Sequence, residues 1–115
     1  MAEPTVYFNP GCSKCRTAQA ILADKGVTAT FIRYLDTPPT IDELRRLMML
    51  LGIDDPRAMM RTGEPVYGLQ NLEHASSDAL LAAIAAYPVL LERPIVVVGD
   101  RAVIARPPER LLEIL

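Results

Sequence analysis

Residues 6–16 read Val6-Tyr7-Phe8-Asn9-Pro10-Gly11-Cys12-Ser13-Lys14-Cys15-Arg16. The apolar run at the start has the composition of a short buried strand. From about Cys12 onward, apolar residues recur at three- and four-residue spacing, which indicates a helix. A helix N-terminus has unpaired backbone N–H groups and carries roughly half a positive charge, and both stabilise a thiolate. The two cysteines therefore lie where a strand gives way to a helix, a position that makes a thiol nucleophilic at neutral pH.

The cysteine pair has two chemical interpretations, reactive thiols or metal ligands. A structural zinc ion takes four ligands. The chain contains no other cysteine and one histidine, His74, so a zinc site would have to borrow carboxylates. The sequence therefore favours redox or nucleophilic chemistry at Cys12 and Cys15, and we predict no metal site.

The composition is typical of one small domain. The chain has 115 residues, of which 50% are hydrophobic, and a net charge of -2. This charge gives no reason to expect nucleic acid or an anionic membrane as a partner. The apolar runs are far shorter than the ~20 residues that span a bilayer, and the first residues lack a signal-peptide pattern. We expect a cytoplasmic protein, because in that compartment a Cys-x-x-Cys pair is more often catalytic or redox-sensing than structural.

Three further stretches have the composition of strands. Residues 28–34 are rich in β-branched and aromatic side chains. Residues 95–98 and 102–105 lie on either side of Gly99-Asp100, which suits a two-residue hairpin turn. The first strand, the helix and the second strand follow one another closely, which implies a right-handed crossover and parallel pairing.

Helical patterns fill the middle and the end of the chain. A capping box, Thr40 followed three residues later by Glu43, begins the first of the middle helices. The order is βαβ, a helical stretch, then ββα. It predicts an α/β, thioredoxin-like fold with a mixed four-stranded sheet flanked by helices. Residues 1–115 would form a single domain with a helical insertion at about 40–90.

Three arginines are candidates for binding an oxyanion, because the forked guanidinium group contacts two oxygens at once. Arg61 ends a short amphipathic segment just before a break in the chain, and Glu64 either pairs with it or faces solvent. Arg93 and Arg106 flank the predicted hairpin. The alternative for each arginine is a solvated surface charge.

Several short segments occur together in order: Tyr7-Phe8-Asn9-Pro10-Gly11-Cys12, Tyr34-Leu35-Asp36-Thr37-Pro38-Pro39, Asp42-Glu43-Leu44, Arg61 with Glu64-Pro65, Arg93-Pro94-Ile95-Val96-Val97, and Arg106-Pro107. In this arrangement the chain resembles the glutaredoxin-linked arsenate reductase family over essentially its whole length. The thioredoxin-like fold that the resemblance implies commonly has a cis X-Pro bond before its third strand, facing the reactive cysteine. Here that bond would be Arg93-Pro94.

The resemblance implies that Cys12 is the nucleophile and that Arg61, Arg93 and Arg106 surround the oxyanion. In the family's mechanism the thiolate attacks arsenate to give a cysteine-arsenate adduct. Glutathione, a co-substrate, then attacks; glutaredoxin regenerates the enzyme, and arsenite leaves, as in arsenic detoxification. No bound cofactor is implied. Three guanidinium groups would neutralise the oxyanion and lower the pKa of the cysteine.

Two residues depart from the family's pattern. Phe8 stands where many members have a histidine close enough to favour the thiolate. Cys15 stands where arsenate reductases of this type usually have a non-cysteine residue. Cys15 either resolves the adduct, leaving a Cys12–Cys15 disulfide for glutaredoxin or thioredoxin to reduce, or is a small residue of the first helical turn.

The cysteine pair keeps two other functions open. A thiol–disulfide reductase without arsenate activity would use Cys12 and Cys15 and need none of the three arginines. Redox-sensing transcription regulators of the Spx type share the fold, the Cys-x-x-Cys pair and an Arg-Pro-Ile segment; they bind RNA polymerase and catalyse nothing. These regulators do not usually keep an arginine at the position of Arg106, which favours the enzyme.

Overall fold

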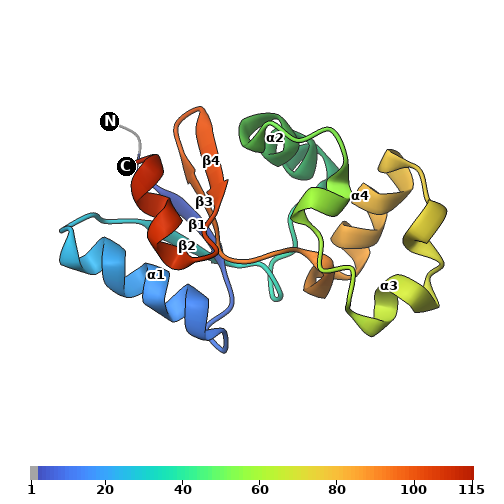
Figure 1. Cartoon of the computed structure of the whole chain (residues 1–115), viewed down its shortest axis with the longest axis horizontal. Coiled ribbons are helices and arrows are strands. Elements are labelled where there is room, and N and C mark those ends of the chain that lie inside the picture. Colours follow the sequence, from blue (N-terminus) through green and yellow to red (C-terminus); the bar gives the residue numbers. More distant parts are fainter. Residues whose placement is uncertain (1–2) are drawn as a thin grey trace. The chain divides into compact units, whose positions relative to one another are not determined.

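The computed structural model describes residues 3–115 as two compact units (Figure 1). The first unit comprises residues 3–37 together with Arg93–Leu115, and the second comprises Pro38–Glu92. The second unit corresponds to the helical insertion that the sequence predicts at about residues 40–90. That the two units make up one domain stays a prediction.

A mixed four-stranded sheet forms the centre of the first unit, with strand order β2-β1-β3-β4. Strand β1 (Thr5–Phe8) pairs in parallel with β2 (Thr30–Arg33) and antiparallel with β3 (Ile95–Val98). Strand β4 (Arg101–Ile104) pairs antiparallel with β3. The predicted sheet and the thioredoxin-like order of elements are confirmed. Strand β2 is shorter than the predicted stretch, because only its four central residues pair with β1.

The hairpin between β3 and β4 is closed by a two-residue turn, as the sequence predicts. Val98 pairs with Arg101 across Gly99-Asp100. Gly99 has φ 60°, in the left-handed region that glycine adopts without steric cost. The register of the hairpin therefore follows from the position of this glycine.

Helix α1 (Ser13–Asp24) and the 3-10 helix η4 (Pro108–Glu113) pack against each other in the first unit, as the blue and red helices of Figure 1 show. Their inward side chains and those of the strands form one buried cluster: Val6, Phe8, Cys12, Cys15, Ala18, Leu22, Val96, Val103, Ala105 and Leu111. Both cysteines therefore belong to the hydrophobic core. The predicted C-terminal helix takes the tighter 3-10 form and spans a single short segment.

The second unit is helical, and its first helix begins and ends as the sequence predicts. Helix α2 (Ile41–Leu51) starts with the capping box: the Glu43 N–H donates to Thr40 Oγ1 at 3.1 Å, and the Thr40 N–H donates to Glu43 Oε1 at 2.9 Å. Gly52, with φ 71°, ends it. The remaining elements are η1 (Pro56–Met59), α3 (Pro65–Leu69), η2 (Leu72–His74), α4 (Ser77–Ala86) and η3 (Pro88–Leu90). Among the helices of residues 3–115, none has the length and apolar character needed to cross a membrane.

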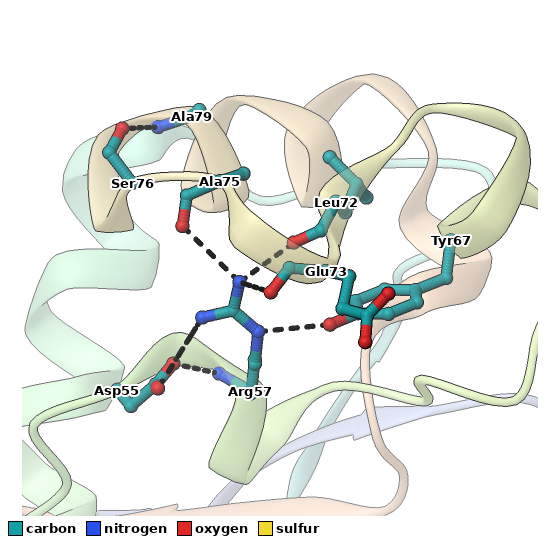
Figure 2. Close-up of polar contacts among 8 residues, drawn as sticks. All are labelled: Asp55, Arg57, Tyr67, Leu72, Glu73, Ala75, Ser76 and Ala79. Atoms are coloured by element: carbon teal, nitrogen blue, oxygen red, sulfur yellow. Dashed lines mark hydrogen bonds and ion pairs between the residues drawn. The ribbon is translucent and has the colours of Figure 1, made fainter.

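One arginine organises the irregular part of the second unit (Figure 2). Arg57 Nη2 donates to the carbonyl oxygens of Leu72 (2.7 Å), Glu73 (2.7 Å) and Ala75 (3.2 Å). Its Nε donates to the Tyr67 hydroxyl at 2.9 Å, and its Nη1 lies 3.3 Å from Asp55 Oδ1. Carbonyl groups of η2 and of the residue that follows it thus accept from a side chain of η1. Nothing in the sequence indicates this role.

Candidate active site

Cys12 is the N-cap residue of helix α1, with extended backbone dihedrals of φ -95° and ψ 125°. The loop that leads to it from β1 is held by Asn9, whose carbonyl oxygen accepts from the Cys12 N–H at 2.9 Å. The Oδ1 atom of Asn9 accepts from the Gly11 N–H, also at 2.9 Å. Asparagine commonly bonds the backbone two residues on, so this turn could have been predicted from the Asn-Pro-Gly sequence.

The surroundings of Cys12 favour its thiolate. Burial by itself raises the pKa of the Cys12 thiol, because it disfavours the charged form. The backbone N–H and the thiol of Cys15, the guanidinium of Arg93 and the backbone N–H of Lys14 lower the pKa, and together they bring it from 9.0 to about 7. A large fraction of Cys12 is therefore nucleophilic at neutral pH.

Cys15 is the third residue of α1 and is completely buried, with 0% of its surface exposed. Its Sγ accepts from the Asn9 backbone N–H at 3.5 Å. Burial is the main reason that the pKa of Cys15 rises to about 11, and the neighbouring Cys12 thiolate raises it further. Both cysteines are free thiols. The surroundings thus favour the thiolate form of Cys12 and the thiol form of Cys15.

Arg93 lies beside both cysteines, since its positive charge lowers the pKa of each. The Nε and Nη1 atoms of its guanidinium group are buried. The Arg93-Pro94 peptide bond is cis, which confirms the expectation drawn from the fold, and β3 begins at the next residue. The structure thus places Arg93 beside Cys12; that Arg93 binds an oxyanion stays a prediction.

Arg106 lies at the end of the hairpin with Arg93. Its Nη1 donates to the Arg93 carbonyl oxygen at 2.9 Å, and the Ala105 N–H donates to the Pro94 carbonyl oxygen at 2.9 Å. The Arg106-Pro107 bond is also cis, a feature that the sequence analysis missed. A hydrogen bond from the Arg106 side chain to the Arg93 backbone therefore links the two arginines that flank the hairpin.

Arg61 belongs to the second unit, whereas Arg93 and Arg106 belong to the first. Its Nε lies 3.7 Å from Glu64 Oε1, so of the two alternatives for Glu64 the structure favours the ion pair. The Arg61 N–H donates to the Leu90 carbonyl oxygen at 2.7 Å, which fixes its backbone. That Arg61 joins the site around Cys12 stays a prediction. Within residues 3–115, no group of three or more His, Cys, Asp or Glu is placed to hold a metal ion.

Residues 7–114 match the ArsC family. The chain belongs to the ArsC family. The arsenate reductase of Haemophilus influenzae is 45% identical over 112 residues, which cover 96% of this chain and 97% of that protein. The arsenate reductase of Neisseria meningitidis serogroup A is 42% identical over 118 residues, with both chains fully covered. A solved structure described as arsenate reductase from Vibrio cholerae has a TM-score of 0.95 at 46% identity, and the match covers 99% of this chain and 98% of that one.

Membership of the ArsC family confirms the resemblance seen in the sequence motifs, and it extends over both units of the chain. The helical second unit is therefore part of the family's pattern. Within this ArsC-family chain, the groups that the structure gathers in the first unit are a helix-capping cysteine, a second buried cysteine and two linked arginines.

Proposed function

We propose that this chain reduces arsenate to arsenite, with Cys12 as the nucleophile. The observation that carries the proposal is a cysteine with a pKa of about 7 at a helix N-terminus, beside a guanidinium group with buried nitrogens. This combination suits attack by a thiolate on an anion, because the arginine offsets the repulsion between the two negative charges. The names of the H. influenzae and N. meningitidis relatives support arsenate as the oxyanion.

In the first step Arg93 and Arg106 bind the oxyanion, and the family resemblance implies Arg61 as a third arginine. Cys12 Sγ forms a bond to arsenic, one As–O bond breaks, and the oxygen leaves as water after protonation. Guanidinium groups aimed at the developing charge contribute to such a step, and losing one donor costs about 2–4 kcal/mol of transition-state stabilisation. Arg93 has a second task, since its charge also favours the thiolate.

The reduction itself needs two electrons, which two thiols supply as they become a disulfide. Arsenic passes from the +5 to the +3 state when the S–As bond breaks and its electron pair stays with arsenic. Glutathione is the co-substrate that supplies electrons over repeated turnovers, and glutaredoxin or thioredoxin returns the protein to its reduced form. The cytoplasm provides these reductants and keeps Cys12 and Cys15 as thiols.

The test is arsenite formation from arsenate by the reduced protein with glutathione and glutaredoxin. We expect wild type to turn over and Cys12→Ser to be inactive, because a hydroxyl is a far poorer nucleophile at neutral pH. Turnover by Cys12→Ser at the wild-type rate would rule out the mechanism. If wild type forms no arsenite although its Cys12 thiol is reactive, arsenate reduction is ruled out as the function.

A second candidate function is thiol–disulfide reduction without arsenate activity, and one observation favours it. The pKa values of Cys12 and Cys15 are about 7 and about 11, so Cys12 is the nucleophile and Cys15 stays a thiol at neutral pH. Reduction of a glutathionylated peptide, with no arsenite formed, would identify this activity. Arg106→Ala would leave that activity intact, since no oxyanion has to be bound. If neither reaction occurs, binding to RNA polymerase tests the regulator alternative.

A further inference from the structure

Cys12 and Cys15 are one helical turn apart on the same helix. Cys12 is the N-cap and Cys15 the third residue of α1, and side chains three residues apart lie on one face of a helix. Both side chains belong to the same buried cluster, with Phe8 and Ala105 as neighbours. The Cys15 thiol acts directly on the Cys12 thiolate, since it lowers the pKa of Cys12. The two sulfurs are therefore neighbours before any reaction.

The two thiols differ in access from solvent. Cys12 is 9% exposed, whereas Cys15 is 0% exposed. Cys12 therefore offers some surface to an external thiol such as glutathione, whereas Cys15 offers none. The electrophile that Cys15 can reach is the adduct that forms on the sulfur of Cys12.

The state of Cys12 also controls the state of Cys15. The negative charge of the Cys12 thiolate raises the pKa of Cys15, and the positive charge of Arg93 lowers it. When Cys12 bonds to arsenic, negative charge stays in the adduct, and Arg93 remains beside Cys15, where its positive charge favours ionisation of that thiol.

We propose that Cys15 is the resolving thiol: it attacks Cys12 Sγ in the arsenate adduct, forms a Cys12–Cys15 disulfide and expels arsenite. This inference rests on the proposed function and names the thiol that completes it. The S–S bond forms as the S–As bond breaks, and the electron pair of the S–As bond leaves with arsenic. Arsenic is reduced by two electrons, the two sulfurs are oxidised by two in total, and the Cys15 proton passes to the departing arsenite.

Recycling then proceeds through the more exposed sulfur. A dithiol reductant of the glutaredoxin or thioredoxin class attacks Cys12 Sγ and releases Cys15 as a thiol. The second thiol of the reductant then frees Cys12 and takes up the disulfide. Glutathione is not needed for the release of arsenite, only as a source of electrons for the reductant.

A single turnover without glutathione tests this step. Fully reduced protein is mixed with arsenate, and arsenite, alkylatable thiols and peptide masses are measured. We expect up to one arsenite per chain and, in the same proportion, the loss of both thiols to a disulfide within one chain. Cys15→Ala should release no arsenite under these conditions, while glutathione plus glutaredoxin should still drive its turnover. Gln19→Ala, exposed on the same helix, is the control and should behave as wild type.

The outcomes separate the two proposals. Arsenite from wild type only when glutathione is added, or glutathione-free arsenite from Cys15→Ala equal to that of wild type, would overturn the role of Cys15 and leave the reductase function standing. No arsenite under either condition would overturn both. Circular dichroism checks the fold of Cys15→Ala, and Cys15→Ser serves as a second variant. If both variants misfold, the disulfide and arsenite yields of wild type alone decide.

Discussion

The Nη1 atom of Arg106 donates a hydrogen bond of 2.9 Å to the carbonyl oxygen of Arg93. This carbonyl belongs to the residue whose guanidinium lies beside Cys12 and lowers its pKa. One arginine thus fixes the backbone from which the other reaches Cys12.

We predict that Arg106→Ala lowers kcat/KM for arsenate by about 2–4 kcal/mol, or roughly 30- to 1000-fold. Arg106→Lys should recover only part of this loss, because one ammonium group cannot hold the Arg93 carbonyl and bind an oxyanion in bidentate fashion. Steady-state kinetics with varied arsenate measure the effect. Arg101→Ala, exposed at the start of β4, is the control. Equal kinetics for Arg106→Ala and Arg101→Ala would show that Arg106 has no part in the reaction.

The second prediction concerns the pH dependence of Cys12. The reacting species is the thiolate, so its alkylation rate should rise with pH and level off above a midpoint of about 7. Arg93→Ala should move this midpoint to higher pH, since Arg93 lowers the pKa of Cys12. Cys15, with a pKa of about 11, should not contribute near neutral pH. Iodoacetamide kinetics followed by mass spectrometry give both midpoints; an unchanged midpoint in Arg93→Ala would contradict the assignment.

The third prediction concerns the stability of the second unit. Arg57→Ala removes a guanidinium that donates to three carbonyl oxygens and one hydroxyl. Because these groups lose a charged donor, we expect Arg57→Ala to lower the free energy of unfolding by more than the loss of an exposed ion pair does. Urea denaturation measures it. The exposed ion-pair residue Arg45 provides a control: Arg45→Ala should cost less than about 1 kcal/mol. A loss for Arg57→Ala no larger than the control's would contradict this role.

The fourth prediction concerns Phe8, at the position where the family resemblance implies a histidine in many members. Phe8 is 8% exposed and meets Phe31 edge to face, with ring centroids 5.1 Å apart, in the cluster that contains Cys12. Phe8→His should lower the free energy of unfolding by about 1–3 kcal/mol, because it buries a polar group. An imidazole N–H near the thiolate should also lower the alkylation midpoint of Cys12. Phe8→Leu should destabilise without moving the midpoint. A midpoint that shifts equally in both variants would trace the effect to packing.

Local signals in the sequence predicted much of the fold. The capping box of Thr40 and Glu43 and the Gly99-Asp100 turn each depend on residues within a few positions, so their chemistry can be recognised in one dimension. The placement of Cys12 at a helix start follows from the same kind of signal.

The features that the sequence did not predict depend on distant partners. The bond from Arg106 to the Arg93 carbonyl spans 13 residues, and those from Arg57 span 15 to 18. In the sequence, an arginine that donates a hydrogen bond to a carbonyl group cannot be distinguished from one that faces solvent. The last helix takes the 3-10 form and packs against α1, which is also distant in the sequence.

The central claim is a covalent bond between Cys12 and arsenic, and Cys15→Ala offers a direct measurement of it. Reduced Cys15→Ala is mixed with arsenate in the absence of glutathione, quenched rapidly and analysed by mass spectrometry. The account predicts a species heavier by arsenate less one water, carried on Cys12 and absent from the Cys12→Ser variant. Unmodified Cys12 in a sample that forms arsenite once glutathione is added, or the same added mass in Cys12→Ser, would contradict it.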